Sequence, residues 1–309
     1  MWVLIAIATG AHAQSFPNKP IRILTGGAGG GNDILARLIA QGLTVSLGQQ
    51  VIVDNRPSGV IPGDILAKSP PDGYTLAVSG SSFWISLLFL DKPPYDPVRD
   101  FSAVTLPVST PNILAVNSWF PVKSVKDLIA LAKAKPGELN YATPRTGSSP
   151  HLGGELFKAM AGINIARINY KSAGAALSDL ISGQIQMTVI VAPAVVPHVK
   201  SGRLKALAVT SAQASALVPD LPTVAASGLP GYELISPFGI FASARTPEAI
   251  INRLNQEIVR VLNRPESKEL LINAGLEIVG SSPEQLAATV KSEVAKWSRV
   301  IGDAGIRAD

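Results

Sequence analysis

The sequence predicts an α/β protein of two lobes, each built around a mainly parallel sheet. The chain has 309 residues, which is more than one hydrophobic core readily accommodates. Its composition, with 47% hydrophobic and only 16% charged residues, is typical of buried parallel strands. After Pro20, short β-like runs alternate with segments of helical periodicity. Together these observations favour two α/β units over a coiled coil or a disordered chain.

The N-terminal third opens with a strand–helix–strand unit. Residues 21–24 form the first predicted strand, and a glycine-rich turn follows. A helix then begins at Asn32 or Asp33, and residues 51–53 form the next strand. Such a unit is almost always right-handed and parallel, so the two strands are expected to be neighbours in one sheet.

The rest of the chain repeats this alternation. Ser124 is expected to cap a helix, with Asp127 three residues later completing a capping-box-like pair. A strand over residues 139–142 runs into a turn, and a helix follows over residues 151–160. The remaining predicted elements are strands at 74–78, 113–116, 185–191 and 206–209, a helix at 175–181, and two tail helices that start with a cap and a proline at 246–248 and 282–285.

Strand-like runs near residues 104–113 and 232–240 join two otherwise complete α/β sets. We therefore expect the chain to cross between its lobes at these two places. Lobe one then comprises residues 14–108 together with 236–309, and lobe two comprises residues 109–235.

Residues 1–13 are interpreted as the remnant of a signal peptide, because an apolar run at 2–8 precedes an Ala-x-Ala cleavage pattern at 11–13. The run is too short to span a bilayer, which needs about 20 residues. No Lys or Arg precedes the run, so the basic start typical of a signal peptide is missing. A buried first strand is the alternative, and Pro17 argues against it.

Two strand-to-helix turns form the candidate binding site. In an open parallel sheet, ligands bind beyond the carboxyl ends of the strands. The turns at residues 25–33 and 143–150 each lead into a helix N-terminus, where free backbone N–H groups and the helix dipole favour an anion. Facing each other across a cleft, they would hold a carboxylate from both sides. The candidate residues are Thr25, Gly26, Gly27, Ala28, Gly29, Asn32 and Asp33 in the first turn, and Arg145, Thr146, Gly147 and Ser148 in the second.

Simpler roles compete for two residues of this site. Asp33 is better explained as the cap of its helix than as a ligand contact. His151 begins the helix after the second turn, and lining the cleft or packing beside the turn are equally open roles for it.

Common catalytic and metal-binding constellations are absent from the sequence. There is no Cys, which excludes thiol catalysis, thiolate metal sites and disulfides. Neither a G-x-S-x-G elbow nor an H-E-x-x-H helix occurs. We therefore expect no enzyme activity, no metal and no cofactor. The basic residues are scattered singly, which argues against nucleic-acid binding, while the net charge of +5 suits an anionic ligand.

A dinucleotide site is the alternative for the glycine-rich turn. The G-x-G-x-x-G spacing from Gly27 and Gly29 reaches Asn32 instead of a third glycine. Asp54, about twenty residues further on, imitates the acidic residue that binds a ribose. A Rossmann-type, NAD-dependent oxidoreductase thus stays as an alternative function.

Motifs at residues 16–22, 71–76, 147–152 and 219–224 are examples of a series that covers the chain after residue 15. In sequence and in order, these motifs resemble the substrate-binding proteins of tripartite tricarboxylate transporters, also called Bug proteins. The resemblance implies a periplasmic binding protein with a two-lobe Venus-flytrap fold, which holds a carboxylate and delivers it to a membrane permease. It also implies further site walls at Ser79, Ser81, Ser82 and Val191. We expect a monomer, and a sensor that presents the same ligand to a signalling partner is a further alternative.

The chain departs from the family pattern at three places. The family usually has Pro-Phe-Pro-Pro where this chain has Thr-Gly-Gly-Ala at residues 25–28, so an aromatic wall is missing. Phe83 and Trp84 could replace it, although core packing explains them better. Ile190 stands where many members have Asp, which removes a partner for a ligand ammonium group. We therefore expect a ligand without an amino group, either aromatic or a dicarboxylate paired with Arg145; a solvated loop charge is the alternative role of Arg145.

Overall fold

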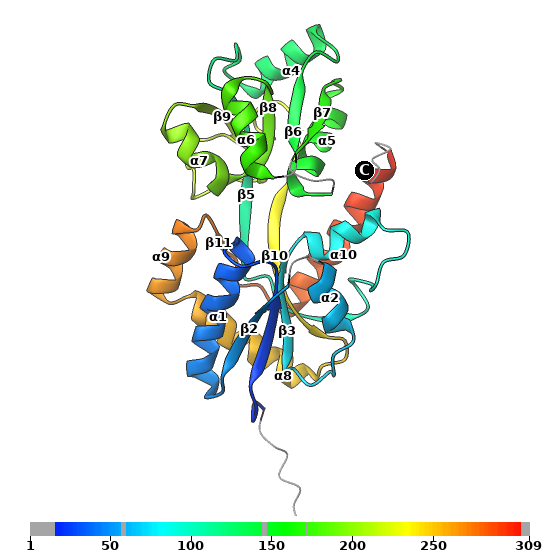
Figure 1. The fold of residues 1–309 in the computed structure, drawn as a ribbon, viewed down its shortest axis with the longest axis vertical. Coiled ribbons are helices and arrows are strands. Elements are labelled where there is room, and N and C mark those ends of the chain that lie inside the picture. Colours follow the sequence, from blue (N-terminus) through cyan, green and yellow to red (C-terminus); the bar gives the residue numbers. More distant parts are fainter. Residues whose placement is uncertain (1–15, 57–59, 144–146, 171, 304–309) are drawn as a thin grey trace, which may run out of the picture.

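The computed structural model describes residues 16–56, 60–143, 147–170 and 172–303. Two α/β lobes lie one above the other along the long axis of the molecule (Figure 1). The two-lobe α/β fold predicted from the sequence is thereby confirmed.

Lobe one is built on three parallel strands in the order β2-β1-β3. The strands are β1 (Ile21–Thr25), β2 (Val51–Asn55) and β3 (Thr75–Gly80). Its first helices are α1 (Gly31–Leu47), α2 (Val60–Ala67), the short α3 (Ser82–Ile85) and the 3₁₀ helix η1 (Ser86–Phe89). The parallel pairing of β1 with β2 confirms the predicted strand–helix–strand unit.

Lobe two repeats the plan with the parallel order β8-β6-β7. Its strands are β6 (Asn140–Thr143), β7 (Ala166–Asn169), β8 (Met187–Val191) and β9 (Leu204–Val209). Its helices are α4 (Val125–Ala134), α5 (Ser149–Ala161), α6 (Ala173–Ser182) and α7 (Ala192–Lys200).

Two long antiparallel strands join the lobes at the waist (Figure 1). They are β5 (Val108–Asn117) and β10 (Ile235–Ser243). β10 pairs with β3 through residues 238–242 and with β5 through residues 235–237. β5 then pairs with β8, so one continuous path of strands runs from lobe one into lobe two. Two short strands, β4 (Phe101–Thr105) and β11 (Glu277–Ile278), pair with β10 and β5.

The C-terminal helices return to lobe one (Figure 1). They are α8 (Glu248–Leu262), α9 (Pro265–Asn273) and α10 (Pro283–Asp303). α1 packs closely on α8, because a Cβ atom on Gly42 would lie only 2.3 Å from Val261. In the described part of the chain, no helix is both long and apolar enough to cross a membrane.

Side-chain caps are present at two of the helix starts that the sequence marks. Ser124 Oγ accepts a hydrogen bond from the Asp127 amide at 3.1 Å, as predicted. Ser282 Oγ likewise accepts from the Gln285 amide, and the Gln285 side chain accepts from the Ser282 amide. The predicted cap at Asp33 is wrong, since α1 begins at Gly31 with Gly30 at its N-cap position. The cap predicted at Thr246 is also wrong, because Pro247 takes the N-cap position of α8 and Thr246 Oγ1 donates to the Ser243 carbonyl.

Candidate ligand-binding site

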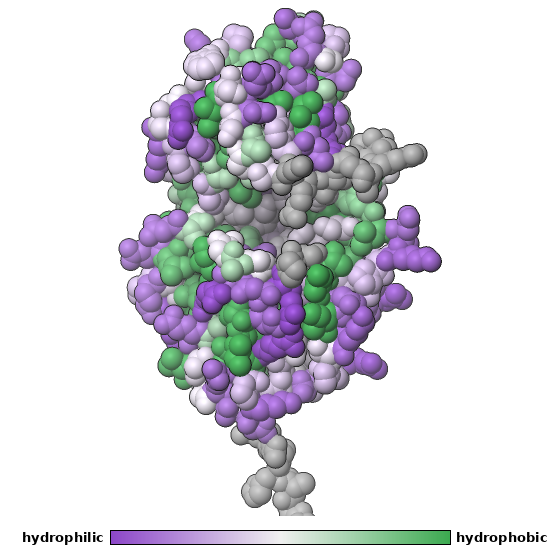
Figure 2. Space-filling view, in the orientation of Figure 1, coloured by the Kyte–Doolittle hydropathy of each residue, from purple (hydrophilic) through white to green (hydrophobic). Residues whose placement is uncertain are grey.

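A cavity of about 410 Å³ lies between the lobes, where the surface is hollowed at the waist (Figure 2). Its volume is within the range of small-molecule sites. The lining residues are Asn32, Val60, Gly80, Ser81, Ser82 and Ser86 of lobe one, Gly147, Ser148, Ser149 and Val191 of lobe two, and Thr110, Ser236, Pro237 and Phe238 of the connecting strands. None of the lining side chains in the described part of the chain is charged. The cavity offers hydroxyl groups and an apolar wall.

Six residues predicted for the site come together in this cavity. They are Asn32, Ser81, Ser82, Gly147, Ser148 and Val191. Arg145 and Thr146 lie outside the described residues. The other predicted residues lie outside the cavity lining: most belong to the first turn or to strand ends beside it, and His151 lies beside the second turn.

The first turn is held by a buried carboxylate. Asp33 Oδ2 accepts hydrogen bonds from the Gly29 amide at 2.9 Å and from Arg37 Nε at 3.0 Å. Asp33 Oδ1 accepts from Asn55 Nδ2 at 2.8 Å, and the same nitrogen donates to the Gly26 carbonyl. The hydrogen bond from Arg37 is the main cause that lowers the pKa of Asp33 from 3.8 to about 2, so the group is a carboxylate at neutral pH. Its contacts bind the turn together and do not line the cavity.

Two predicted residues at strand ends are buried in the sheet. Thr25 is fully buried, and its Oγ1 donates to the Val78 carbonyl at 3.0 Å. Ser79 is 2% exposed and lies within β3, opposite Gly239 of β10. Gly27, Ala28 and Gly29 are exposed and are not part of the cavity lining. From the first turn, only Asn32 reaches the cavity wall.

The second turn ends at the N-terminus of α5. Ser148 takes the N-cap position in an extended conformation, and Pro150 lies in the first helical turn. His151 is buried, with 1% exposure, and its Nδ1 accepts from the Gly147 amide at 2.9 Å. This bond requires an unprotonated Nδ1. The buried His151 side chain therefore fixes the backbone at Gly147.

A chain of hydrogen bonds links the connecting strands to α5. Asn112 Nδ2 of β5 donates to Ser236 Oγ of β10 at 3.2 Å. Ser236 Oγ donates in turn to Ser149 Oγ at 2.9 Å. Ser149 and Ser236 both line the cavity, so the first turn of α5 is positioned by the same strands that join the lobes.

Most of the apolar wall comes from residues that were not predicted from the sequence, and Val191 is the exception. Phe238 of β10 lines the cavity and packs over Gly31, where a Cβ atom would lie 3.3 Å from the ring. Phe83 and Trp84 are fully buried in the core, so they do not provide the missing aromatic wall. Ile190 also faces a hydrophobic cluster, and it is the next residue, Val191, that lines the cavity.

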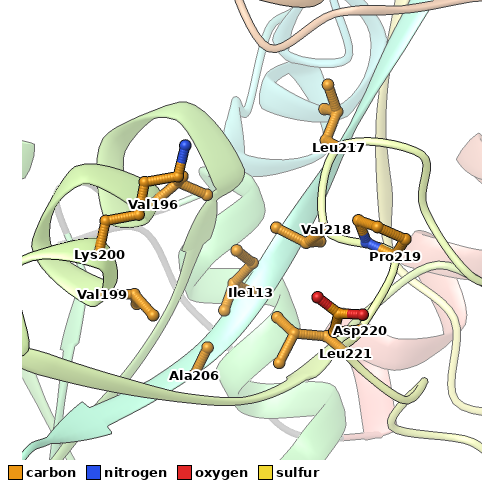
Figure 3. A pocket seen from close by; sticks show the side chains of 10 residues that line it. All are labelled: Ile113, Val196, Val199, Lys200, Ala206, Leu217, Val218, Pro219, Asp220 and Leu221. Carbon is orange, nitrogen blue, oxygen red and sulfur yellow. The ribbon is translucent and has the colours of Figure 1, made fainter.

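A second cavity, of about 400 Å³, lies on lobe two between α7 and residues 217–221 (Figure 3). Its lining is apolar apart from Lys200 and Asp220, and it contains none of the predicted site residues. All of its walls belong to one lobe, so a movement between the lobes would not open or close it. The cavity at the waist is therefore the candidate site.

Comparison with known proteins decides the family. The family model described as "Tripartite tricarboxylate transporter family receptor" matches residues 35–306. The chain belongs to this family. Protein BugT of Bordetella pertussis is 35% identical over 306 residues, which cover 97% of this chain and 94% of that protein.

Solved structures of similar proteins show the same fold. R. palustris Rpa4515, solved with adipate, has a TM-score of 0.81 and 36% identity, and the match covers 95% of this chain and 100% of that one. MatC from Rhodopseudomonas palustris, solved with bound malate, has a TM-score of 0.76 and 27% identity, covering 93% and 100%. The family resemblance inferred from the sequence motifs is thus confirmed.

Membership of a receptor family disfavours the oxidoreductase alternative. The structure also gives Asp54 another role, since its Oδ2 accepts from Arg22 Nε and from Arg56 Nη2, each at 2.8 Å. A carboxylate held by two guanidinium groups is poorly placed to accept from a ribose hydroxyl. In the described residues, no cluster of three or more potential metal-ligating side chains occurs.

Proposed function

We propose that this receptor captures a small dicarboxylate without an amino group in the cavity between its lobes. The observation that carries the proposal is the cavity lining. Both lobes contribute hydroxyl groups, lobe two adds the backbone at the N-terminus of α5, and the described lining includes no acidic side chain. Neutral donors and a helix N-terminus suit a carboxylate. An ammonium group would lack a carboxylate partner there.

The relatives support this ligand class. One similar structure was solved with adipate and another with malate, and neither compound carries an amino group. The uncharged walls formed by Val60, Val191 and Phe238 fit the carbon chain of such a ligand. Arg145, in the second turn, is proposed to pair with a carboxylate, together with the predicted contacts from Gly147, Ser148 and the loop at Ser81 and Ser82.

Capture is proposed to occur by closure of two lobes, residues 14–108 with 236–309 and residues 109–235. The lobes would hinge at the connecting strands β5 and β10. Closure around the ligand excludes water and strengthens the hydrogen bonds to the carboxylate. No covalent bond is made or broken in this process.

We place the receptor in the periplasm as a monomer, exported through the signal segment at residues 1–13. It would deliver its ligand to the membrane permease of a tripartite tricarboxylate transporter. The family match supports this partner.

A thermal-shift panel on refolded protein tests the proposal, because refolding removes ligand that co-purifies. Adipate or malate should raise the Tm by a few degrees, since a ligand at 100 times its Kd stabilises a protein by about 2.7 kcal/mol. Aspartate and glutamate should act more weakly. Stabilisation by NAD or by a cationic compound, with none by the carboxylates, would contradict the proposal.

Two serine substitutions test whether the ligand binds in this cavity. Ser149→Ala removes a cavity hydroxyl and should weaken adipate binding about 5- to 30-fold, which corresponds to about 1–2 kcal/mol. The control is Ser178→Ala in α6, where the exposed hydroxyl only donates to the Gly174 carbonyl. Equal affinities of the two variants in isothermal titration would place the ligand elsewhere.

A further inference from the structure

The 3₁₀ helix η1 of lobe one begins at the edge of the cavity. Ser86, at the start of η1, lines the cavity. In a 3₁₀ helix the side chains at positions i and i+3 lie above one another. Phe89, three residues later, therefore lies on the same face of η1, one turn further along.

The ring of Phe89 contacts the second turn in lobe two. A Cβ atom on Gly147 would lie 2.9 Å from Phe89 Cε2 and 3.0 Å from Cδ2. Gly147 also has a positive φ of 74°, which other residues rarely adopt. Both the conformation and the close approach of the ring require glycine at this position.

The same ring lies near the side chain that anchors the turn. The ring centroids of Phe89 and His151 are 6.4 Å apart and their planes are tilted by 38°. His151 in turn accepts the hydrogen bond from the Gly147 amide. Phe89 and His151 thus contact the turn from two directions, and only Phe89 belongs to the opposite lobe.

We propose that Phe89 is a positioning residue of the ligand site. When the lobes close, its ring packs on Gly147 and holds this residue and the N-terminus of α5 in the position that meets the carboxylate. When the lobes open, the ring loses this contact and becomes exposed, which disfavours opening. Phe89 therefore slows ligand release without touching the ligand. This inference rests on the proposed function.

The test compares Phe89→Ala with Leu90→Ala, a truncation of the next residue, whose side chain is exposed and belongs to no hydrophobic cluster. Adipate is the probe, and its release is followed by stopped-flow fluorescence. Phe89→Ala should release adipate on the order of tenfold faster, and Leu90→Ala should match the parent protein. Unfolding midpoints of the ligand-free proteins show that both variants fold. Equal release rates in a folded Phe89→Ala variant would overturn the proposal.

Lobe closure can be measured directly, because the chain has no Cys and two can be introduced cleanly. Lys133→Cys in α4 and Asn252→Cys in α8 are exposed sites at opposite ends of the molecule, suitable for a pair of dyes. Phe89→Ala should shift the ligand-free distance distribution toward longer distances. An unchanged distance distribution would overturn the proposed contact of Phe89. Failure of adipate to bind the parent protein is a separate outcome, which would count against the proposed function and not against this contact.

A double-mutant cycle identifies the partner of the ring. Gly147→Ala should weaken adipate binding through both the clash with Phe89 and the strain of a positive φ. In the Phe89→Ala background the clash is absent, so the same substitution should cost several-fold less affinity. Additive effects of the two substitutions would contradict a direct contact between the residues.

Discussion

Asp33 stabilises the glycine-rich turn and is not part of the cavity lining. Its buried carboxylate accepts from a backbone amide of the turn and from the Arg37 and Asn55 side chains. The sequence marked Asp33 as a site residue or a helix cap. The contacts instead make it the anchor of the glycine-rich turn.

This anchoring predicts a pH-dependent loss of stability. The pKa of Asp33 is lowered from 3.8 to about 2 in the folded protein, so its contribution is present above about pH 4 and is lost as the pH falls toward 2. Asp33→Ala should reduce the free energy of unfolding by about 1–3 kcal/mol at pH 6, because buried donors lose their acceptor. The difference from the parent protein should be smaller at pH 3.

Urea unfolding at both pH values measures the effect. Asp64→Ala, which removes an exposed ion pair with Lys68, serves as the control and should change stability by less than about 1 kcal/mol. A difference between Asp33→Ala and the parent protein that does not vary with pH would contradict the assignment.

The alternation of residues along a strand predicts whether a side chain is buried only if the last residue of the strand is known. Thr25 and Ser79 follow predicted strand residues, and both proved to be the last buried positions of longer strands. Phe238 lies inside a hydrophobic run of β10, where its sequence neighbours give no sign that one side chain reaches a cavity. Such cavity-lining residues can be recognised only from the positions of the two connecting strands in the structure.

Among the elements, α5 packs closely against its sheet and has its N-terminus at the cavity. A Cβ atom on Gly154 would lie 2.1 Å from the Tyr141 ring of β6, and one on Gly153 would lie 2.5 Å from Leu234. These glycines let the helix approach the strands and set the position of its N-terminus at the cavity.

Gly154→Ala should therefore disturb both stability and binding. Overpacking of this kind costs about 1–3 kcal/mol, and the displaced helix should bind adipate more weakly. Gly174→Ala in α6 is the matched control, because a Cβ atom there meets only the Ser172 hydroxyl at 4.0 Å. That substitution should leave binding unchanged and raise stability by up to about 1 kcal/mol. Chemical unfolding and isothermal titration of the two variants decide the matter; equal binding by both would contradict the role of α5.

The sequence predicts elements well where a cap or a clear hydrophobic period marks them, as at α4 and α10. It did not predict α7, because Pro193 and Pro197 lie within nine residues and proline normally breaks a helix. The edge strand β7 has four largely exposed residues and so lacks the alternation that marks a half-buried strand. The short η1 has too few residues for any period, and Phe89 was missed with it.

At the scale of the whole molecule, the two connecting strands both join the lobes and form the back of the cavity. Thr110 of β5 and Ser236 of β10 line it, and the hydrogen bond from Ser236 reaches Ser149 on α5. Movement of the lobes about these strands would change the cavity itself.

The dicarboxylate is proposed to bind at the waist, between the lobes. A crystal structure of the protein with adipate would show where it binds. We predict one carboxylate within hydrogen-bonding distance of Ser148 or Ser149, with the carbon chain against Phe238. Adipate bound instead in the lobe-two cavity beside Lys200, or a waist cavity left empty in crystals that contain saturating adipate, would rule out the waist as the binding site.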